Sequence, residues 1–490
     1  MPRYRTRAET AKDVVSEVVV NIPLYLIDLQ EPSFSLKSRN QIKDSVRDEL
    51  YEEIASIDDR INACSRAREA FSYAILSHRW GPGEPDFGTI VEKGGVTPAS
   101  NDTVLSELQG YQKLLKFCLE ARTLGFKYAW ADICCIDKSS SAEWQESVNS
   151  MYAWYANSSL CIVYLHGLES LDELGKHEWF RRGWTLQELL APESLIFYKD
   201  DWTPLDPVNL GKGKGVNDKL NTKIRPIIAE TTGIRPIFLD GFYPKSNKQP
   251  KLVMELMGWA SRRKTERPED IAYCLLGIFN IAMPILYGEG DMAFHRLQME
   301  IMKRSPDWTL LFWGGLQSSY SNLFAIHPRS FDYRKWNEEA ARLRESLLPG
   351  EGVGYHPGSL EDETTAPPHV LTQNGLCVQW DTYPVEKLNC RENKHTKDFI
   401  YRVKATGLTE IFFRSTTGFL EPPKVRGHFY LASIGPPSPG ASSIPVWLVY
   451  NRYVKNSNKF KALLRAEPIV AEKLPGGQGI NRSFYLDVTP

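Results

Sequence analysis

Four short apolar runs alternate with segments of helical character between residues 73 and 198, and this alternation constrains the fold most. The apolar runs are Tyr73–Leu76, Tyr128–Ile136, Leu160–Leu165 and Leu195–Tyr198. Three other segments carry apolar residues at helical spacing, namely Leu105–Leu124, Trp144–Trp154 and Trp184–Leu190. Strands that alternate with helices usually pair in parallel, with helices on both faces of the sheet. We therefore predict an α/β domain over residues 71–205 with a mainly parallel sheet. Its central strands are expected at Tyr73–Leu76, Tyr128–Ile133 and Leu160–Leu165.

The first 70 residues show two further patterns. Glu17–Asp28 is rich in β-branched residues and predicts a strand. Beyond it, one apolar stripe has the alternating spacing of an amphipathic helix, and it consists of Leu50, Ile54, Ile57, Ile61 and Cys64. We expect this helix to pack on the core; a coiled-coil contact with a partner is the alternative.

Helical patterns continue as far as about residue 305, and the character of the sequence then changes. The expected helices are Leu252–Ala260, Pro268–Phe279 and Asp291–Lys303. After residue 306, Pro, Gly and Ser become frequent, and six β-prone runs follow: Cys377–Trp380, Phe399–Val403, Glu410–Arg414, His428–Ser433, Val446–Tyr450 and Phe484–Val488. A chain of 490 residues needs more than one core. We expect four parts, which are residues 1–70, 71–205, a helical extension at 206–305, and a mostly β domain at 306–490.

Charge and cysteine usage argue against several classes of partner. The formal net charge of −1 provides no field that attracts nucleic acid or an anionic membrane. No apolar run approaches the roughly 18 residues of a membrane span, and the polar segment Met1–Asp13 lacks the apolar core of a secretory signal. The eight cysteines form no C-x-x-C pair, so we expect reduced thiols, no metal site and a cytoplasmic location.

Three sequence blocks carry a family resemblance. They are Tyr73-Ala-Ile-Leu-Ser-His-Arg-Trp80, Trp130-Ala-Asp-Ile-Cys-Cys-Ile-Asp137 and Trp179-Phe-Arg-Arg-Gly-Trp-Thr-Leu-Gln-Glu-Leu-Leu190. Their order and spacing resemble the heterokaryon-incompatibility (HET) domain of fungi, and further matching segments extend the resemblance over roughly residues 71–305. Lys138 departs from the Gln that is usual in the family. The resemblance implies vegetative incompatibility, cell death or an immune-like response, self-association on activation, and a partner protein that triggers incompatibility.

HET domains in turn resemble TIR domains, which have a flavodoxin-like α/β fold, and some of which cleave NAD with one glutamate. The spacing from Trp184 to Glu188 is similar to that of the TIR motif to within one residue, so the resemblance assigns Glu188 as the catalytic residue. The chemistry is compatible with a single carboxylate. Nicotinamide leaves a cationic pyridinium without needing a proton, whereas an ordinary glycosidase needs a second carboxylic acid for its leaving group. NAD is thus expected as a substrate rather than as a cofactor.

The loop Ser77–Trp80 follows one predicted strand, Asp132 lies within another with Asp137 just after it, and Trp184 opens a predicted helix. In parallel sheets, ligands collect beyond the carboxyl ends of the strands. Ser77 and the carboxylates could bind sugar hydroxyls, Arg79 could pair with the pyrophosphate, and either Trp80 or Trp184 could stack on a base. The complete set of expected substrate-binding residues is Ser77, His78, Arg79, Trp80, Asp132, Asp137 and Trp184.

Several alternatives remain open at this stage. Glu188 could form a structural ion pair with Arg181 or Arg182, Asp132 could bind backbone amides, and the tryptophans could be core packing. Cys134 and Cys135 suggest a nucleophile only weakly, because no base is fixed beside them. At the level of function, the alternative to an NAD glycohydrolase is a non-catalytic module that oligomerises or recruits a cell-death effector.

Overall fold

The computed structural model describes residues 7–30, 33–97, 108–207, 217–245, 253–305, 307–311, 313, 317–318 and 321–332, and the residues in strands from 370 to 486. The chain divides into two compact units. The first comprises residues 1–245 and 273–285, and the second comprises residues 246–272 and 286–490.

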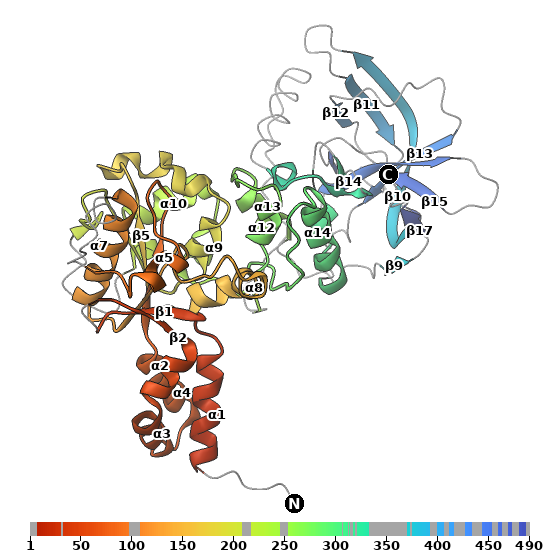
Figure 1. The fold of residues 1–490 in the computed structure, drawn as a ribbon. Helices are drawn as coiled ribbons and strands as arrows, with labels where there is room; N and C mark the ends of the chain where they lie inside the picture. The colour runs from red at the N-terminus through yellow and green to blue at the C-terminus, as the bar shows by residue number, and fades with distance from the viewer. Residues whose placement is uncertain are drawn as a thin grey trace, which may run out of the picture. The chain divides into compact units, whose positions relative to one another are not determined.

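A six-stranded sheet forms the centre of the first unit, in the order β2-β1-β4-β3-β5-β6 (Figure 1). Its strands are β1 (Tyr25–Asp28), β2 (Leu36–Ser38), β3 (Tyr73–Ser77), β4 (Tyr128–Trp130), β5 (Leu160–Tyr164) and β6 (Leu195–Tyr198). The strands β4, β3, β5 and β6 run parallel to one another, whereas β1 pairs antiparallel with β2 and β4. The prediction of a mainly parallel sheet with three central strands is confirmed.

Helices cover this sheet because its strands are apolar on both faces. Every residue of β3, β5 and β6 is buried. Figure 1 shows α7 (Gln109–Thr123) on one side of β5 and α9 (Thr185–Leu190) on the other. Two tyrosine hydroxyls join α8 (Ser141–Asn157) to β3. Tyr73 of β3 donates a hydrogen bond to the carbonyl of Trp154, and Tyr155 of α8 donates one to the carbonyl of Leu76. The other helices of this part of the unit are α5 (Phe87–Glu92), α10 (Ile224–Thr232) and α11 (Pro236–Asp240), with 3-10 turns η1 (Leu171–Lys176), η2 (Glu178–Arg181) and η4 (Asp218–Leu220).

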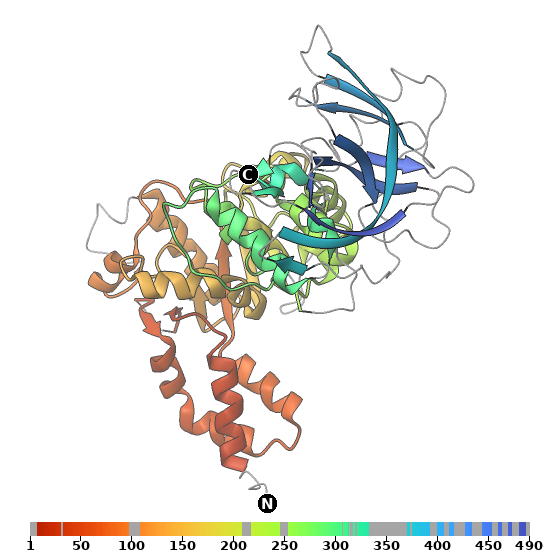
Figure 2. The ribbon, with the colours of Figure 1, turned by 90° about the vertical axis from the view of Figure 1, so that its right-hand side faces the viewer.

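The N-terminal residues form a helical group beside β1 and β2, and two predictions are corrected there (Figures 1 and 2). Its helices are α1 (Arg7–Val19), α2 (Arg39–Ser45), α3 (Arg47–Ala55) and α4 (Arg60–Ala70). The strand prediction for Glu17–Asp28 is right only for Tyr25–Asp28, and its first three residues form the end of α1. Val14, Val15, Val18 and Val19 are all buried at helical spacing, so packing overrides the β preference of valine.

The single amphipathic helix predicted across Leu50–Cys64 is also wrong. The chain forms α3 and α4 instead, because Asp59 starts a new helix by accepting a hydrogen bond from Asn62 N–H at 2.9 Å. The predicted stripe is broken, since Leu50 is buried while the side chain of Ile61 is 76% exposed. Both helices pack on α1 within the same unit.

Two other predicted elements are shorter than expected. The strand predicted over Tyr128–Ile136 ends at Trp130, because Ala131 O accepts the N–H groups of Cys134 and Cys135 and turns the chain. The helix predicted over Pro268–Phe279 is helical only in α13 (Asp270–Tyr273). Turns follow it, and in them Gly277 packs closely on α8, since a Cβ atom on Gly277 would lie 2.0 Å from Tyr152 Cβ.

The second unit contains two of the predicted helices and most of the predicted β runs. Its helices are α12 (Val253–Ala260) and α14 (Met292–Arg304), with η5 (Trp308–Leu311), η6 (Pro328–Phe331) and the short strands β7 (Gln317–Ser318) and β8 (Ser321–Ala325). Gln298 joins α14 to β8 by bonding both the N–H and the carbonyl of Ala325. No helix in the described parts of the chain has the length and apolar character needed to cross a membrane.

From residue 370 onward, the described residues lie in strands of one sheet. These are β9 (Val370–Thr372), β10 (Gly375–Glu392), β11 (Phe399–Ala405), β12 (Ile411–Ser415), β13 (Gly427–Ser433), β14 (Ser443–Arg452), β15 (Lys459–Ala462), β16 (Ile469–Glu472) and β17 (Ile480–Leu486). Each of the six β-prone runs overlaps one of these strands. That residues 306–490 form a domain of their own, and the other domain boundaries, stay predictions.

Candidate functional site

Three polar residues predicted for the site, Ser77, Asp132 and Glu188, come from segments that meet where the winding of the parallel sheet reverses. The chain passes from β3 to β4 on one side, and then crosses to β5 and β6 on the other. Ligand sites of open α/β sheets form at the carboxyl ends of strands at such a reversal. Ser77 is the last residue of β3, Asp132 lies in the turn after β4, and α9, which carries Glu188, follows β5.

A buried chain of hydrogen bonds connects Trp179, Ser77 and Glu188. Ser77 Oγ donates to Glu188 Oε2, and Trp179 Nε1 donates to Ser77 Oγ at 2.8 Å. Ser77 is fully buried, and Trp179 and Glu188 are 1% and 6% exposed. An indole N–H can only donate, so it occupies a lone pair of Ser77 and leaves the single hydroxyl proton for the carboxylate. Trp179 thus fixes the direction of the Ser77–Glu188 hydrogen bond.

The local structure that presents Glu188 is a tight turn between η2 and α9. Thr185 Oγ1 donates to the carbonyls of Trp179 and Arg182, at 2.5 and 2.9 Å, and so joins the two segments. All six residues of α9 are buried. The carboxylate acts on its buried neighbours: burial raises the pKa of Tyr155 and Cys161 well above their usual values, and the charge of Glu188 raises both further.

A second cluster lies beside the first, on the loop that follows β3. Asp132 Oδ1 is 3.3 Å from His78 Nε2, and Asp132 Oδ2 accepts a hydrogen bond from Trp80 Nε1 at 2.9 Å. Burial raises the pKa of the Asp132 carboxyl, but His78, Lys138 and Trp80 together outweigh burial and hold that pKa below its usual value. Asp132 therefore holds a negative charge and fixes the indole of Trp80, whose side chain remains 41% exposed.

Lys138, the departure from the family pattern, contacts this second cluster. Its Nζ lies 3.7 Å from the centre of the Trp80 ring, in a cation–π contact. Burial lowers the pKa of the Lys138 ammonium, although the charge of Asp132 opposes that shift. The exposed indole of Trp80 thus already carries a cation on one face.

A further cation at this edge of the sheet comes from α7. Lys113 Nζ donates to Glu84 and to the carbonyl of Arg79, and Glu84 Oε1 lies 3.6 Å from His78 Nδ1. These contacts place the His78 side chain, which is 1% exposed, between two carboxylates.

The remaining predicted residues have other contacts. Arg79 pairs with Glu178 at 2.7 Å on the surface. Asp137 accepts hydrogen bonds from the hydroxyl and N–H of Ser139, which lower the pKa of its carboxyl. Trp184 is half-buried at the start of α9. The structure thus brings Ser77 to Glu188, and His78 and Trp80 to Asp132, but holds Arg79 and Asp137 in separate contacts.

Sequence reasoning did not select Trp179 or Lys113 as members of this site. Trp179 opens the third sequence block, so its place in the motif was a usable signal. Lys113 is one lysine on an amphipathic helix, and nothing in its spacing marks it. Among the described residues, no group of three or more His, Cys, Asp or Glu side chains is arranged to hold a metal ion.

The mainly parallel sheet with polar clusters at its carboxyl edge shows an α/β domain of the kind that binds ligands at that edge. Comparison with known proteins shows which families it is similar to. Residues 73–173 match the model of the family described as heterokaryon incompatibility protein (HET). This stretch holds the first two sequence blocks, so residues 73–173 are similar to a HET domain. Residues 292–350 match a domain of unknown function, DUF8212.

One curated relative shares a longer stretch. The chain is 38% identical over 244 residues to the vegetative incompatibility protein HET-E-1 of Podospora anserina. The match covers 47% of this chain and 16% of the relative, so it spans only a small part of that longer protein. No solved structure matches the chain.

Proposed function

We propose that this protein acts in fungal heterokaryon incompatibility, and that its HET domain does so by hydrolysing NAD to nicotinamide and ADP-ribose, with Glu188 as the catalytic residue. The HET match and the relative's name support the biological role. The observation that carries the reaction is the Ser77–Glu188 hydrogen bond at the carboxyl edge of the parallel sheet. Depletion of NAD is the step that leads to cell death.

The chemistry requires one negative charge near the ribose. The bond between the pyridinium nitrogen and the ribose breaks with both electrons going to nitrogen, so neutral nicotinamide leaves without being protonated. The ribose carbon becomes cationic, water adds to it, and one proton is released to solvent. A carboxylate held next to that carbon stabilises the positive charge and orients ribose hydroxyls.

The neighbouring residues have binding roles in this proposal. Ser77 and Asp132 bond ribose hydroxyls, and Arg79 exchanges Glu178 for the pyrophosphate, since its ion pair is exposed and therefore weak. Trp80 offers an exposed ring face to a base, with Trp184 beside Glu188 on the same helical segment. A carboxylate accepts several hydrogen bonds, so a ribose hydroxyl that reaches Glu188 adds to the bond donated by Ser77.

Burial of Glu188 favours a second function, in which the HET domain is a non-catalytic module. A carboxylate that is 6% exposed and bonded to a buried serine also suits a purely structural role. The protein would then act by self-association or by recruiting a cell-death effector.

One assay distinguishes the catalytic function from the non-catalytic one. Purified full-length protein, alone and assembled, is incubated with NAD while nicotinamide is measured. The catalytic account predicts release above the uncatalysed rate, weakened but not abolished by Ser77→Ala and by Asp132→Asn. Absence of release by the wild type, including protein recovered from cells undergoing incompatibility death, would favour the module.

A further inference from the structure

The carboxylate of Asp132 keeps acceptor positions for a ligand at the carboxyl edge of the sheet. Its Oδ1 is 3.3 Å from Nε2 of His78, and its Oδ2 accepts the hydrogen bond from Nε1 of Trp80 at 2.9 Å. Because each carboxylate oxygen can accept about two hydrogen bonds, each oxygen retains one position. The side chain of Asp132 is 24% exposed, so a ligand can reach it.

Asp132 acts only as an acceptor. Burial raises the pKa of its carboxyl, but His78, Lys138 and Trp80 outweigh burial and hold that pKa below its usual value. The carboxylate is therefore ionised at neutral pH and has no proton to donate. A hydroxyl group can donate to it, whereas a phosphate group carries charge of the same sign and is repelled.

The indole of Trp80 determines where a base lies relative to this carboxylate. Nζ of Lys138 is 3.7 Å from the centre of the ring and occupies one face. Trp80 is still 41% exposed, so ring surface remains on which a base can stack. Because Trp80 is hydrogen-bonded to Asp132, a base that stacks on this ring can direct its ribose to that carboxylate.

The carboxylate of Glu188 lies near that of Asp132. Burial raises the pKa of the Tyr155 hydroxyl, and the charges of Glu188 and Asp132 raise it further, so both carboxylates lie near this one residue. One dinucleotide can therefore contact both. If Glu188 faces the nicotinamide ribose, as the proposed function requires, the base on Trp80 is adenine and the ribose beside Asp132 belongs to the adenosine.

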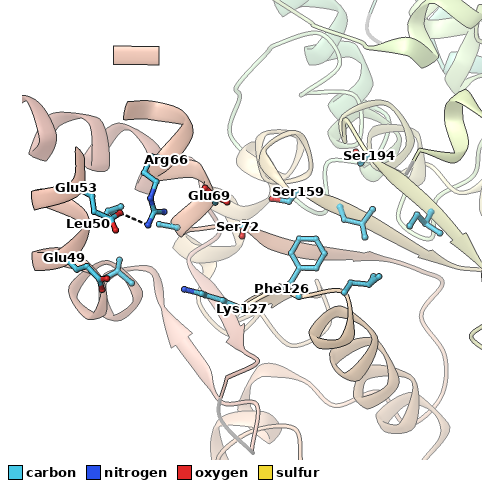
Figure 3. Close-up of a pocket in the computed structure, with 16 residues that line it drawn as sticks. Glu49, Leu50, Glu53, Arg66, Glu69, Ser72, Phe126, Lys127, Ser159 and Ser194 are labelled. Carbon is cyan, nitrogen blue, oxygen red and sulfur yellow. Dashed lines mark ion pairs between the residues drawn. The ribbon is translucent and has the colours of Figure 1, made fainter. Parts of the chain in front are cut away.

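A cavity of about 540 Å³ in the same unit lies at the opposite edge of the sheet (Figure 3). Ser72, Lys127 and Ser159 line it, and each directly precedes a parallel strand, namely β3, β4 and β5. Ligands of parallel sheets bind beyond the carboxyl ends of the strands. This cavity is therefore not the nucleotide site, and a substitution that fills it serves as a control.

We propose that Asp132 accepts hydrogen bonds from the 2′- and 3′-hydroxyls of the adenosine ribose and thereby selects NAD against NADP. NADP carries a phosphate on the 2′ oxygen, so it loses one of these hydrogen bonds and brings negative charge to the carboxylate. His78 and Trp80 are positioning residues, since each holds one oxygen of Asp132. Of the nearby cations, Lys138 contacts the Trp80 ring and Arg79 is assigned to the pyrophosphate.

Two adenosine nucleotides test this preference without any cleavage. Adenosine 5′-monophosphate has a free 2′-hydroxyl, and adenosine 2′,5′-bisphosphate carries a phosphate in its place. Calorimetry on the full chain at pH 7 should show the monophosphate binding about tenfold or more tightly. Equal affinities, tighter binding of the bisphosphate, or binding of neither nucleotide would overturn the proposal.

Substitutions locate the source of the preference. Asp132→Asn keeps the size of the side chain and removes the charge, so the preference should fall to about twofold or less. Asp172→Asn makes the same change at an exposed position of η1 and should leave the preference unchanged. Ser159→Trp fills the cavity and should leave both affinities unchanged. A preference that survives Asp132→Asn, or nucleotide binding that a folded Ser159→Trp protein loses, would contradict the role of Asp132.

Cleavage assays distinguish this inference from the proposed hydrolysis on which it rests. The wild type should show a kcat/KM for NAD at least about tenfold higher than for NADP, and Asp132→Asn should show nearly equal values. Equal cleavage of both dinucleotides by the wild type would contradict the role of Asp132 but not that of Glu188. Preferential binding of the monophosphate without release of nicotinamide would contradict hydrolysis and support the role of Asp132.

Discussion

At the residue scale, the account depends on how the side chain of Glu188 is held. A serine hydroxyl that received no bond from Trp179 could rotate toward other acceptors, and the carboxylate would lose its fixed donor. The hydrogen bond from Trp179 is therefore a positioning contact, which acts on Glu188 through Ser77.

Trp179→Phe tests that positioning. The change keeps an aromatic ring against Phe180 and Phe197 but removes the N–H. We expect kcat for NAD to fall about tenfold, which corresponds to about 1.4 kcal/mol, with little change in KM. Trp130→Phe is the matched control, because the buried Nε1 of Trp130 has no hydrogen-bond partner within the described structure. An equal loss of kcat in both variants would show that ring volume, not the N–H, matters.

A second residue-scale prediction concerns pH. Burial raises the pKa of Asp218 to about 6, only partly opposed by the hydrogen bond from Phe197 N–H. The folded state therefore holds the proton longer than the unfolded chain, so stability declines as pH rises from about 4 to about 6 and stays lower above it. Asp218→Asn should remove this decline and raise the unfolding free energy at pH 7 by about 2 kcal/mol. If the unfolding free energies of the variant and the wild type changed in parallel between pH 4 and pH 7, the prediction for Asp218 would be wrong.

At the scale of elements, the strands of the parallel sheet were predicted from the sequence more accurately than the helices outside it. Strands such as β3 and β5 are apolar on both faces because helices cover them, so an uninterrupted apolar run was sufficient to find them. The break between α3 and α4 was missed because the spacing of Leu50 and Ile61 fits one helix, whereas α3 ends at Ala55 and the N-cap Asp59 begins α4. The α1 helix was missed because buried valines are equally typical of strands.

Asp59 supplies a prediction at this scale. Asp59→Ala removes the side chain that caps α4, and we expect the unfolding free energy to fall by about 1 kcal/mol. Glu52→Ala makes the same change of charge at an exposed position of α3 and should have a much smaller effect. Chemical denaturation of both variants measures the difference, and equal losses would mean that charge rather than capping stabilises this turn.

At the scale of the whole molecule, the sequence predicted which residues lie near one edge of the sheet, but not which side chains meet. Ser77 lies at the carboxyl end of β3, whereas Asp132, predicted within a strand, lies in the turn after β4. The separation into a Ser77–Glu188 cluster and an Asp132–Trp80 cluster depends on the directions of the side chains. These directions cannot be predicted from the spacing of the residues in the sequence. The surface pairing of Arg79 with Glu178 depends on a residue outside the predicted set.

The predicted β domain has its own test at this scale. Limited proteolysis should release a stable fragment that begins near residue 306 and has the circular dichroism of a mostly β protein. A stable fragment that begins between residues 246 and 292 would instead include α12 or α14, and would move the boundary to the second compact unit.

The most direct test of the central claim is nicotinamide release by Glu188→Gln, measured with the melting temperature on the same preparation. Glutamine keeps the size of the side chain and an oxygen that accepts the bond from Ser77, and it removes only the charge. If that charge stabilises the cationic ribose, turnover should fall about 100- to 1,000-fold while the melting temperature stays close to that of the wild type. Full turnover in a well-folded Glu188→Gln protein, or a loss of turnover that only follows the loss of folded protein, would contradict the catalytic role of Glu188.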